Sequence, residues 1–501
     1  MQLAKVIVDV PLMQTDKPYS YAVPKEFSTM LEVGMRVHVP FGKANRLIQG
    51  IVVELTEETT PELKEIAEVL DFTPVLNEEQ LWLAEELRKS VFSYKISILK
   101  AMLPGFLNSS YDKILHAQPS LNEQDRLLIF GNEEQQHFLS LDKELQAKVM
   151  RLTRQGAIQV EYQAIDQKHI KTEKWYQVNQ GILEQLVIPQ RANKKQALRD
   201  VLQAQTAMYR LADLKEHFSR EVIHYFVEQE AVQIIEKEVS RSEAYFENVA
   251  TDSALVLNEE QGAAVQAITQ QIEHGGKPFL LEGVTGSGKT EVYLQVIQEA
   301  LSRGKTAIML VPEISLTPQV TNRFIERFGK KVAILHSGLS NGERYDEWRK
   351  VERGEAQVVV GARSAIFAPL KNIGAIIIDE EHEASYKQDS NPRYHARDVA
   401  LLRAKYNQAV LVLGSATPSL ESRARAGKGV YHFLQLTKRA KPQAQIPEVE
   451  IVDFRDYIGQ NEASNFTPIL LEAIQDKLDR KEQVVLMLNR RGYSSFVMCR
   501  E

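Results

Sequence analysis

The pattern of hydrophobic and polar positions changes in character along the chain. Residues 1 to about 110 contain short alternating runs broken by Gly and Pro, such as residues 36–42 and 50–53, and helical periodicity follows around residues 77–103. This pattern predicts a small, β-rich, barrel-like module with helices after it. Residues 1–10 alternate like a strand and lack the long apolar core and cleavage site of a signal peptide, so we expect a cytoplasmic protein.

Residues 112–250 are more polar and mostly helical. Two stretches, residues 149–160 and 222–234, each indicate the end of a helix, a turn and a strand with alternating apolar positions. This pattern is typical of winged-helix units, and a generic helical linker domain explains it equally well. We therefore expect a winged-helix-like region here, with one unit or two.

From residue 251 onward, apolar runs typical of buried strands alternate with stretches typical of amphipathic helices. This alternation predicts a doubly wound parallel sheet. The predicted strands are residues 278–281, 307–311, 332–335, 358–360, 375–378 and 410–413.

The stretch from Gly283 to Thr290 matches the full phosphate-binding template G-x-x-x-x-G-K-[ST], with an apolar strand before it and a helix over residues 291–301. Glycines let backbone N–H groups curl around phosphate oxygens, and the helix N-terminus adds partial positive charge. Lys289 would reach the β- and γ-phosphates, and the Thr290 hydroxyl would bind Mg²⁺. These features predict a nucleotide triphosphatase site.

Gln261 lies at the start of the helix that precedes this loop, where its amide could read the adenine edge. The predicted ATP-binding residues are Gln261, Gly283, Val284, Thr285, Gly286, Ser287, Gly288, Lys289, Thr290 and Glu291.

Acidic residues follow the fully apolar strand at residues 375–378, at the sheet edge where ligands bind in open α/β folds. Asp379 would hold Mg²⁺, and Glu380 would orient and deprotonate the attacking water. With Lys289, these two residues form the predicted catalytic set.

Helix starts after other strands carry polar caps. Thr317 and Thr417, each followed by Pro, are predicted N-caps, and Ser340 with Glu343 forms a predicted capping box. Helix starts of this kind hold DNA phosphates through backbone N–H groups. The hydroxyls of Ser415 and Thr417 would relay between the nucleotide site and DNA.

Composition bounds the possible classes of protein. A chain of 501 residues is too long for one core, so we expect three or four domains. Hydrophobic content of 44% and charged content of 26% are those of a soluble globular protein, and no run of about 18 apolar residues predicts a membrane span. The single cysteine, Cys499, rules out an internal disulfide framework.

The net charge of −6 does not by itself indicate nucleic-acid binding, but three stretches are locally basic. Residues 33–53 contain Arg36, Lys43 and Arg46; residues 385–409 contain Lys387, Arg393, Arg397, Arg403 and Lys405; and residues 483–500 contain Arg490, Arg491 and Arg500.

Six motifs occur in the order GVTGSGKT, VPEISLTPQ, HSGLS, GARSAIF, DEEH and GSATP. In this combination the chain resembles the superfamily 2 helicases and, among them, the PriA (primosomal protein N′) family. Residues 385–388 and 393–398 match that family's aromatic-rich loop after DEEH, and residues 488–493 match the entry to its second lobe. The resemblance covers residues 1–111 and 251–501 well and the middle poorly.

The resemblance implies a multidomain α/β protein with a RecA-like P-loop helicase lobe, an N-terminal β-rich DNA-binding domain and a winged-helix-like helical region. It implies an ATP-dependent 3′→5′ DNA helicase that recognises stalled or forked DNA and helps to load the replicative helicase. Implied partners are forked and single-stranded DNA, primosome proteins, the replicative helicase loader and single-strand-binding protein. The expected domains are residues 1–111, which bind a 3′ DNA end, 112–250, 251–440 as the first helicase lobe, and 441–501 as the start of the second.

Site residues carried by the resemblance fall into three groups. The predicted 3′-end contacts are Tyr19, Ser20, Tyr21, Gly34 and Lys64. The predicted DNA contacts of the lobe, with stacking by Tyr394 and His395, are Thr317, Arg363, Ser364, Tyr386, Lys387, Arg393, Tyr394, His395 and Arg397. The predicted coupling residues are His382, Ser415 and Thr417.

The sequence departs from the family pattern after residue 445. The later helicase motifs and the family's two-zinc cysteine cluster are absent, and Cys499 matches only the first zinc ligand. We therefore expect a truncated chain that binds ATP and Mg²⁺ but hydrolyses ATP poorly, with Zn²⁺ bound only in the complete family member. A non-enzymatic fork-recognition and primosome-assembly scaffold, or a duplex DNA translocase, are the alternatives.

Overall fold

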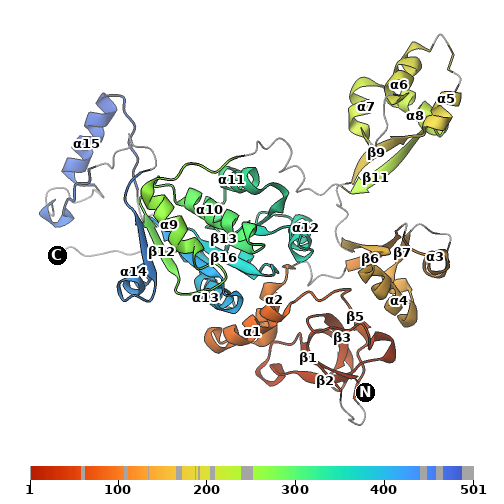
Figure 1. The fold of residues 1–501 in the computed structure, drawn as a ribbon, viewed down its shortest axis with the longest axis horizontal. Coiled ribbons are helices and arrows are strands. Elements are labelled where there is room, and N and C mark those ends of the chain that lie inside the picture. The colour runs from red at the N-terminus through yellow and green to blue at the C-terminus, as the bar shows by residue number, and fades with distance from the viewer. Residues whose placement is uncertain are drawn as a thin grey trace. The chain divides into compact units, whose positions relative to one another are not determined.

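The computed structural model describes residues 2–57, 63–105, 111–118, 120–131, 133, 135–164, 172–186, 188–189, 192–203, 209–238, 252–439, 448–457 and 466–487. Contacts between residues divide the chain into two units, Met1–Pro442 and Gln443–Glu501. Figure 1 shows the elements of both units with the labels used below.

The N-terminal sheet has five antiparallel strands in the order β2-β1-β4-β3-β5. Backbone hydrogen bonds from Ala22 N to Lys64 O (2.9 Å) and from Ile66 N to Ala22 O (3.1 Å) join edge strand β2 to the residues just before β5. The sheet is therefore nearly closed, as the barrel-like prediction required, and both predicted helices follow it. The elements are β1 (Gln2–Val8), β2 (Tyr19–Ala22), β3 (Arg36–Phe41), β4 (Arg46–Glu57), β5 (Glu68–Val69), α1 (Glu78–Val91) and α2 (Lys95–Met102).

The basic stretch over residues 33–53 is not a continuous surface. Arg36 is buried, its backbone N–H donates to Asp71 Oδ2 at 2.7 Å, and its Nη2 lies 2.6 Å from Asp71 Oδ1. Lys43 and Arg46 are exposed. Arg36 is thus a structural ion-pair residue and is not available to DNA phosphates in this structure.

The middle of the chain contains two three-stranded sheets, β7-β6-β8 and β10-β9-β11, each with its own helices. The predicted helix–turn–strand units are confirmed, as α4 to β8 and as α8 to β11. The first set shares a hydrophobic cluster with the N-terminal sheet, and the second has a cluster of its own. The elements are β6 (Tyr111–Ala117), α3 (Glu123–Phe130), β7 (Gln135–His137), α4 (Lys143–Arg154) and β8 (Ile158–Ala164), then β9 (Thr172–Val178), α5 (Gln180–Gln185), α6 (Asn193–Gln203), β10 (Tyr209–Arg210), α7 (Leu211–His217), α8 (Arg220–Glu228) and β11 (Val232–Glu238).

Residues 252–439 form the predicted doubly wound sheet, with seven parallel strands in the order β14-β15-β13-β16-β17-β12-β18. All six predicted strands are present, and edge strand β18 is additional. The strands are β12 (Phe279–Gly283), β13 (Thr306–Leu310), β14 (Val332–Leu335), β15 (Val358–Gly361), β16 (Ile373–Ile378), β17 (Val410–Ser415) and β18 (His432–Leu436). The helices are α9 (Glu259–Thr269), α10 (Lys289–Ser302), α11 (Pro318–Phe328), α12 (Asn341–Glu352), α13 (Ala396–Asn407) and α14 (Leu420–Gly427).

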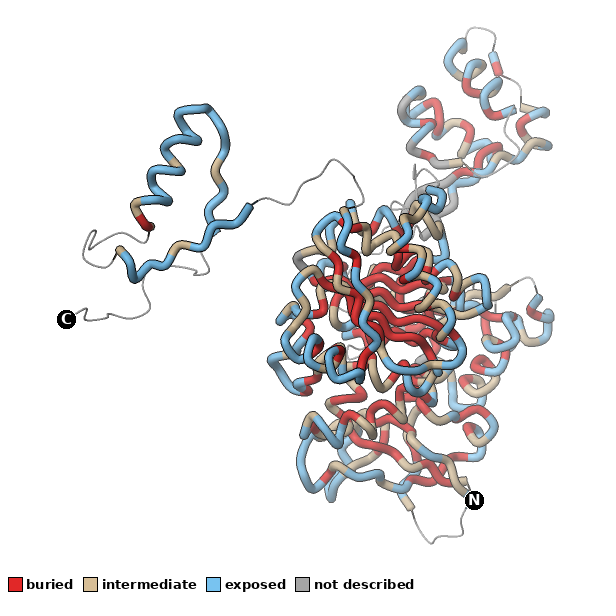
Figure 2. The backbone as a smooth tube through the Cα atoms, turned by 60° about the vertical axis from the view of Figure 1, so that its left-hand side comes forward, coloured by how far each residue is buried: buried red, intermediate tan, exposed pale blue. Residues whose placement is uncertain are grey.

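Two hydrophobic clusters cover the two faces of this sheet. Side chains of α9, α10 and α11 pack on one face, and side chains of α12 and α13 pack on the other. Helices α1 and α2 belong to the second cluster, so the N-terminal helices and the lobe share one core. Figure 2 shows the central strands buried along their length between more exposed helices.

Of the three predicted caps, one is confirmed in full. Ser340 and Glu343 form the capping box of α12, whereas Thr317 occupies the N-cap position of α11, with Pro318 in the first turn, but its side chain makes no capping hydrogen bond. Thr417 is not a cap, because α14 begins at Leu420 and its N-cap is Ser419, whose hydroxyl accepts from Ser422 N at 3.3 Å. The Thr417 N–H donates instead to Ser415 Oγ at 2.9 Å, which holds residues 415–417 in a turn before the helix.

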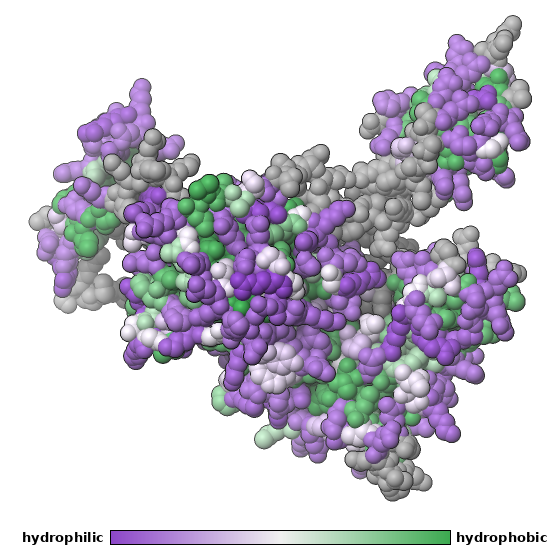
Figure 3. Space-filling model, in the orientation of Figure 1, coloured by the Kyte–Doolittle hydropathy of each residue, from purple (hydrophilic) through white to green (hydrophobic). Residues whose placement is uncertain are grey.

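The second unit contains η10 (Phe454–Tyr457) and α15 (Pro468–Asp479), which Thr467 caps. Cys499, Arg490, Arg491 and Arg500 lie outside the described residues. Among the residues that the structure describes, no helix is long and apolar enough to cross a membrane. On the face drawn in Figure 3, hydrophobic residues form small, separate areas among hydrophilic ones.

Candidate nucleotide and DNA site

The predicted phosphate loop connects β12 to α10. Gly286 and Gly288 have φ angles of 80° and 84°, which turn the backbone as a phosphate-binding loop requires. The Lys289 ammonium donates to Gly283 O at 2.8 Å, so it lies across the loop from the first helical residue to the first loop residue. Ser287 is 1% exposed, and its hydroxyl has no hydrogen-bond partner among the described groups. This cradle fits the oxygens of a triphosphate.

Gln261 supports this loop from the preceding helix. Its Nε2 donates to Ser287 O at 2.8 Å, and its Oε1 accepts from Asn258 N at 2.9 Å in a capping box. Its side chain is buried and both amide groups are engaged. In this structure the Gln261 amide therefore supports the phosphate loop, whereas the sequence predicts that it contacts the adenine edge.

Asp379 and the phosphate loop lie at the same edge of the same sheet. Strand β17 lies between β16 and β12, so the two strand ends are about 10 Å apart at ordinary strand spacing. Tyr293 of α10, one turn after Thr290, bridges this distance and donates its hydroxyl to Asp379 Oδ1 at 3.0 Å. A Cβ atom at position 414 would lie 1.7 Å from the Tyr293 hydroxyl, so Gly414 is required for this contact.

Burial and the charge of Glu380 raise the pKa of Asp379 to about 6. Burial, then the charge of Asp379, raises the pKa of Tyr293 well above its ordinary value, so its hydroxyl remains a donor. Sequence reasoning missed Tyr293. The only available signal was an aromatic residue with a polar tip on the buried face of the helix after the loop.

Two of the three predicted coupling residues, His382 and Ser415, lie next to Glu380, and Thr417 contacts Ser415. His382 Nδ1 lies 2.8 Å from Ser415 Oγ and 3.6 Å from Glu380 Oε2, and Ser415 Oγ lies 3.4 Å from the same oxygen. Glu380 has a φ of 44°, a conformation that costs a non-glycine residue about 1–3 kcal/mol. The ends of β16 and β17 thus place the Glu380 carboxylate, which is carried on a strained backbone, next to His382 and Ser415.

Glu381 was not predicted, yet it is more deeply buried than its acidic neighbours. Its carboxylate accepts from Ser419 N at 2.7 Å and Ser422 Oγ at 2.8 Å, and it lies 3.3 Å from Arg397 Nη1. Arg397, a predicted phosphate contact, is thereby directed toward Glu381 and the start of α14. The sequence gave no signal of this contact, because Ser419 and Ser422 follow Glu381 by 38 and 41 positions.

The aromatic-rich segment at residues 384–397 differs from its prediction. Tyr394 is 2% exposed and packs edge-on against Phe367 at 4.8 Å, and Tyr386 is also buried, with its hydroxyl donating to Asp379 O at 2.6 Å. Neither ring is accessible for base stacking in this structure. Both rings have the environment of core residues, and Tyr386 links the segment to the backbone of Asp379.

The polar residues of the segment are arranged around these rings. Arg363, the first residue of the short helix η8 (Arg363–Phe367) after β15, donates to Ser385 O at 3.2 Å and Lys387 O at 2.7 Å and so supports the segment. His395 caps α13, and burial lowers its pKa. Of the predicted DNA contacts of the lobe, the exposed ones are Lys387, Arg393, Ser364 and, just before α11, Thr317.

Of the predicted 3′-end contacts, Tyr19, Ser20 and Tyr21 lie in β2, whereas Gly34 precedes β3 and Lys64 precedes β5. Tyr19 is half-buried against Phe41 at 5.2 Å, whereas Ser20 and Lys64 are exposed. Tyr21 is buried in the sheet core, and burial raises its pKa to about 12. Gly34 has a φ of 92°, and a Cβ atom there would lie 1.9 Å from Leu76 O, so its close approach is to the chain itself.

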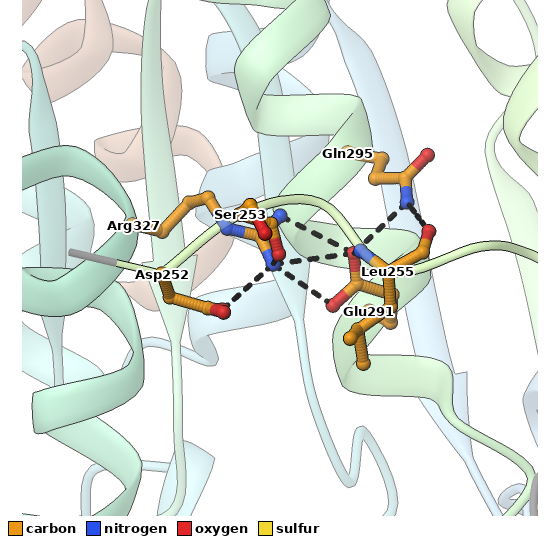
Figure 4. Close-up of polar contacts among 6 residues, drawn as sticks. All are labelled: Asp252, Ser253, Leu255, Glu291, Gln295 and Arg327. Atoms are coloured by element: carbon orange, nitrogen blue, oxygen red, sulfur yellow. Dashed lines mark hydrogen bonds and ion pairs between the residues drawn. The ribbon is translucent and has the colours of Figure 1, made fainter.

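Glu291, predicted to contact ATP, instead binds Arg327 of α11, as Figure 4 shows. Its side chain is 11% exposed. This correction places the Glu291 carboxylate beside the phosphate loop but outside it.

The oxygen ligands that Mg²⁺ prefers are present as the Thr290 hydroxyl and the Asp379 carboxylate. No cluster of three or more His, Cys, Asp or Glu side chains that could hold a metal ion occurs in the described ranges. Two protein oxygens with nucleotide phosphates and water are the usual Mg²⁺ environment of such sites, so the residues fit the ion.

Comparisons with known proteins agree with this architecture. The family described as "Type III restriction enzyme, res subunit" matches residues 254–420, and the family described as "3′DNA-binding domain (3′BD)" matches residues 5–104. With the fold described above, these matches define the class: the chain contains a RecA-like helicase lobe of superfamily 2.

The chain is 43% identical to the replication restart protein PriA of Bacillus subtilis (strain 168) over 520 residues, which cover 100% of this chain and 64% of that protein. It is 36% identical to PriA of Synechocystis sp. over 531 residues, which cover 99% of this chain and 62% of that protein. Over its whole length the chain is therefore similar to the PriA replication restart proteins. It spans less than two thirds of the length of these two relatives.

The solved structure of RecG bound to a three-way DNA junction aligns with 48% of this chain and 30% of that chain, at 23% identity and a TM-score of 0.32.

Proposed function

We propose that the chain supplies the ATP-binding and DNA-binding parts of an ATP-dependent 3′→5′ DNA helicase that acts in replication restart. The observation that carries the proposal is the contact between Tyr293 and Asp379, which joins the helix of the phosphate loop to the acidic residues after β16. Together with the family, this contact supports one composite site for binding and cleaving a triphosphate.

In this proposal Lys289 holds the β- and γ-phosphates, and Thr290 and Asp379 hold Mg²⁺, which would neutralise charge on the phosphates during cleavage. Glu380 orients the attacking water and accepts its proton. His382 and Ser415, which lie next to the Glu380 carboxylate, adjust its position when DNA is bound. Tyr386 connects the same carboxylates to the segment at residues 384–397.

DNA would meet exposed groups at two places. The lobe offers Thr317, Ser364, Lys387 and Arg393, all exposed. The N-terminal sheet offers Tyr19, Ser20 and Lys64 for a 3′ DNA end, where a partly exposed ring can stack on a terminal base for about 1–3 kcal/mol. We further propose that the complete protein recognises forked DNA, interacts with primosome proteins and single-strand-binding protein, and helps to load the replicative helicase.

The test is nucleotide binding by Lys289→Ala, measured with a fluorescent ATP analogue and Mg²⁺. Loss of the Lys289 ammonium should weaken binding by at least tenfold, because a charge-assisted hydrogen bond to phosphate contributes about 1.5–3 kcal/mol. Lys305→Ala is the matched control, since Lys305 donates to Asn372 at the amino ends of β13 and β16, whereas the phosphate loop follows the carboxyl end of β12. Equal affinity in the wild-type and Lys289→Ala proteins would refute the assignment of the site.

Forked DNA with and without a free 3′ leading-strand end tests the second part of the proposal. We expect tighter binding to the fork with the free 3′ end, and a loss of this preference in Tyr19→Ala. A chain that binds both forks equally would contradict the role proposed for the N-terminal sheet.

A further inference from the structure

The guanidinium of Arg327, at the end of α11, connects three segments that are separate in sequence (Figure 4). Its Nη2 lies 3.1 Å from Glu291 Oε2, 2.9 Å from Asp252 Oδ2 and 3.1 Å from Ser253 O, and its Nη1 lies 3.2 Å from Glu291 Oε1. The Arg327 side chain is 3% exposed. A cation this deeply buried has a fixed position, because it depends on these oxygens to replace water.

Glu291 connects Arg327 to the phosphate loop. It is in the first turn of α10, directly after Lys289 and Thr290. Its Oε1 also accepts from Leu255 N at 3.1 Å and from Gln295 Nε2 at 2.9 Å, and Gln295 Nε2 reaches Leu255 O at 2.9 Å. The Glu291 carboxylate accepts hydrogen bonds from several donors, and so it fixes the first turn of α10 relative to Arg327.

The segment held at residues 252–255 leads to the other support of the loop. It runs directly into Asn258 and Gln261, and the Gln261 amide donates to Ser287 O. Arg327 thus acts on the loop from two directions, through Glu291 at the start of α10 and through residues 252–255 on the way to α9.

Arg327 is near the C-terminal end of α11, and Thr317 is at the N-cap of the same helix. Helix α11 contains 11 residues, so it is about 16 Å long at 1.5 Å per residue. In the proposed function, the exposed start of this helix contacts DNA. A rigid helix of that length with one end at DNA and the other bound to Glu291 can transmit a displacement between the two sites.

We propose that Arg327 is a positioning residue for the nucleotide site, and that the pair of Arg327 with Glu291 couples binding of DNA at the start of α11 to binding of the triphosphate at the loop. The inference rests on the proposed function, because it needs both a nucleotide and DNA at the stated places. It goes beyond that function by assigning the coupling to a second route, separate from the segment at residues 384–397.

The experiment measures the affinity of the full chain for a fluorescent ATP analogue with Mg²⁺, with and without single-stranded DNA. The variants are Arg327→Ala, Arg327→Lys and Glu291→Gln. Arg303→Ala is the matched control, since Arg303 pairs with Glu299 at the other end of α10 and is more exposed. Thermal unfolding of each variant measures the purely structural effect.

We expect Arg327→Ala and Glu291→Gln to weaken nucleotide binding by roughly tenfold, which corresponds to about 1.4 kcal/mol, because the first turn of α10 loses its contact with α11. The factor by which DNA changes nucleotide affinity should also fall toward one, since a coupling free energy requires the element that carries it. Arg327→Lys should recover part of both, because an ammonium keeps the charge but cannot bridge both carboxylates in the same geometry. Arg303→Ala should resemble the wild-type protein.

Unchanged nucleotide affinity and unchanged DNA coupling in both Arg327→Ala and Glu291→Gln would overturn the inference. It would also be overturned if the loss of nucleotide affinity in each variant were explained by its lower melting temperature. If Arg327→Ala does not fold, Glu291→Gln and Arg327→Lys decide the question by the same two measurements. Lys289→Ala separates the two levels of argument. If it binds nucleotide as the wild-type protein does, the proposed function fails and the inference fails with it; if only the Arg327 and Glu291 variants are unaffected, the inference fails alone.

Discussion

Arg403 and Glu79 form a buried ion pair between the helicase lobe and the N-terminal helices, with Nε to Oε1 at 2.6 Å and Nη2 to Oε2 at 3.0 Å. The remaining Arg403 nitrogen, Nη1, donates to Ile366 O at 2.6 Å and Ala368 O at 3.0 Å. Arg403 is 0% exposed, and its guanidinium contacts lie beside the hydrophobic cluster that α1 shares with α13. Helix α1 is therefore part of the packing of the lobe.

Glu79→Ala should strongly destabilise the chain, because it leaves the Arg403 charge buried without its partner. Removing one member of a buried pair costs about 3–5 kcal/mol. Urea unfolding followed by circular dichroism measures the effect. Glu86→Ala is the control, since Glu86 pairs with Lys89 at the surface of the same helix, where a pair contributes about 1 kcal/mol or less. Similar unfolding midpoints for the two variants would contradict the role assigned to the buried pair.

The sheet of the lobe was predictable because each of its six predicted strands is a continuous apolar run followed by a turn, which is the pattern of a strand buried on both faces. Strand β18 was missed because residues 432–436 alternate and lie at the exposed edge. The phosphate loop was predictable for a different reason. Its glycine spacing encodes a backbone shape, and a backbone shape is local.

Side-chain contacts between distant segments could not be predicted in this way. Arg403 is 324 positions from Glu79, and the Arg397, Glu291 and Tyr394 side chains face other residues than those expected. Residue type and spacing give the elements that carry these groups. The direction of each side chain depends on which helix packs against it, and that is a property of the folded chain.

Tyr394→Ala should reduce stability, and Tyr394→Phe, which keeps the ring but loses the hydroxyl beside Arg363, should reduce it much less. The ring is buried against Phe367, and truncation of a buried aromatic side chain to Ala costs about 3–5 kcal/mol through lost packing and a cavity. Urea unfolding measures both variants, and DNA binding is measured at a temperature where both are folded. A Tyr394→Ala protein as stable as the wild type, yet defective in binding single-stranded DNA, would show that the ring leaves the core to stack on bases.

Asp379→Asn should stabilise the chain at neutral pH in Mg²⁺-free buffer. Burial raises the folded-state pKa of Asp379 to about 6, against an ordinary value near 3.8, so between these pH values the folded chain holds a proton that the unfolded chain has released. This favourable contribution is complete below about pH 4 and is lost as the pH rises through 6. The Asn variant avoids the buried charge and can still accept from Tyr293.

The free energy of unfolding of Asp379→Asn should therefore exceed that of the wild-type protein above pH 6, by up to about 3 kcal/mol, and the two should converge near pH 4. Urea titrations at pH 4, 5, 6, 7 and 8 with a chelator present give the comparison. A difference that does not vary across this range would mean that Asp379 titrates normally in the folded chain.

Lys113, in β6, is another buried charged side chain, and it lies far from the nucleotide site in sequence. It extends from β6 between the rings of Phe72 and Phe138, at 5.3 Å and 4.8 Å from their centroids, and its ammonium donates to Leu70 O. Burial lowers the pKa of Lys113 to about 8, and the nearby charges of Asp71 and Glu68 oppose the shift only in part. The first of the two middle sheets is thus joined to the N-terminal sheet by a lysine whose charged form is disfavoured.

This environment makes stability depend on pH in the alkaline range. The unfolded chain keeps the Lys113 proton up to about pH 10.5, whereas the folded chain releases it near pH 8, so the unfolded chain binds more protons between these values and the free energy of unfolding rises with pH. From pH 7 to pH 9.5 the wild-type protein should gain roughly 2 kcal/mol relative to Lys113→Met, which has no proton to release. Urea unfolding at pH 7, 8, 9 and 9.5 measures the gain, and Lys143→Met, at an exposed position of α4, should track the wild type. A constant difference between the wild-type and Lys113→Met proteins would place the Lys113 ammonium in water.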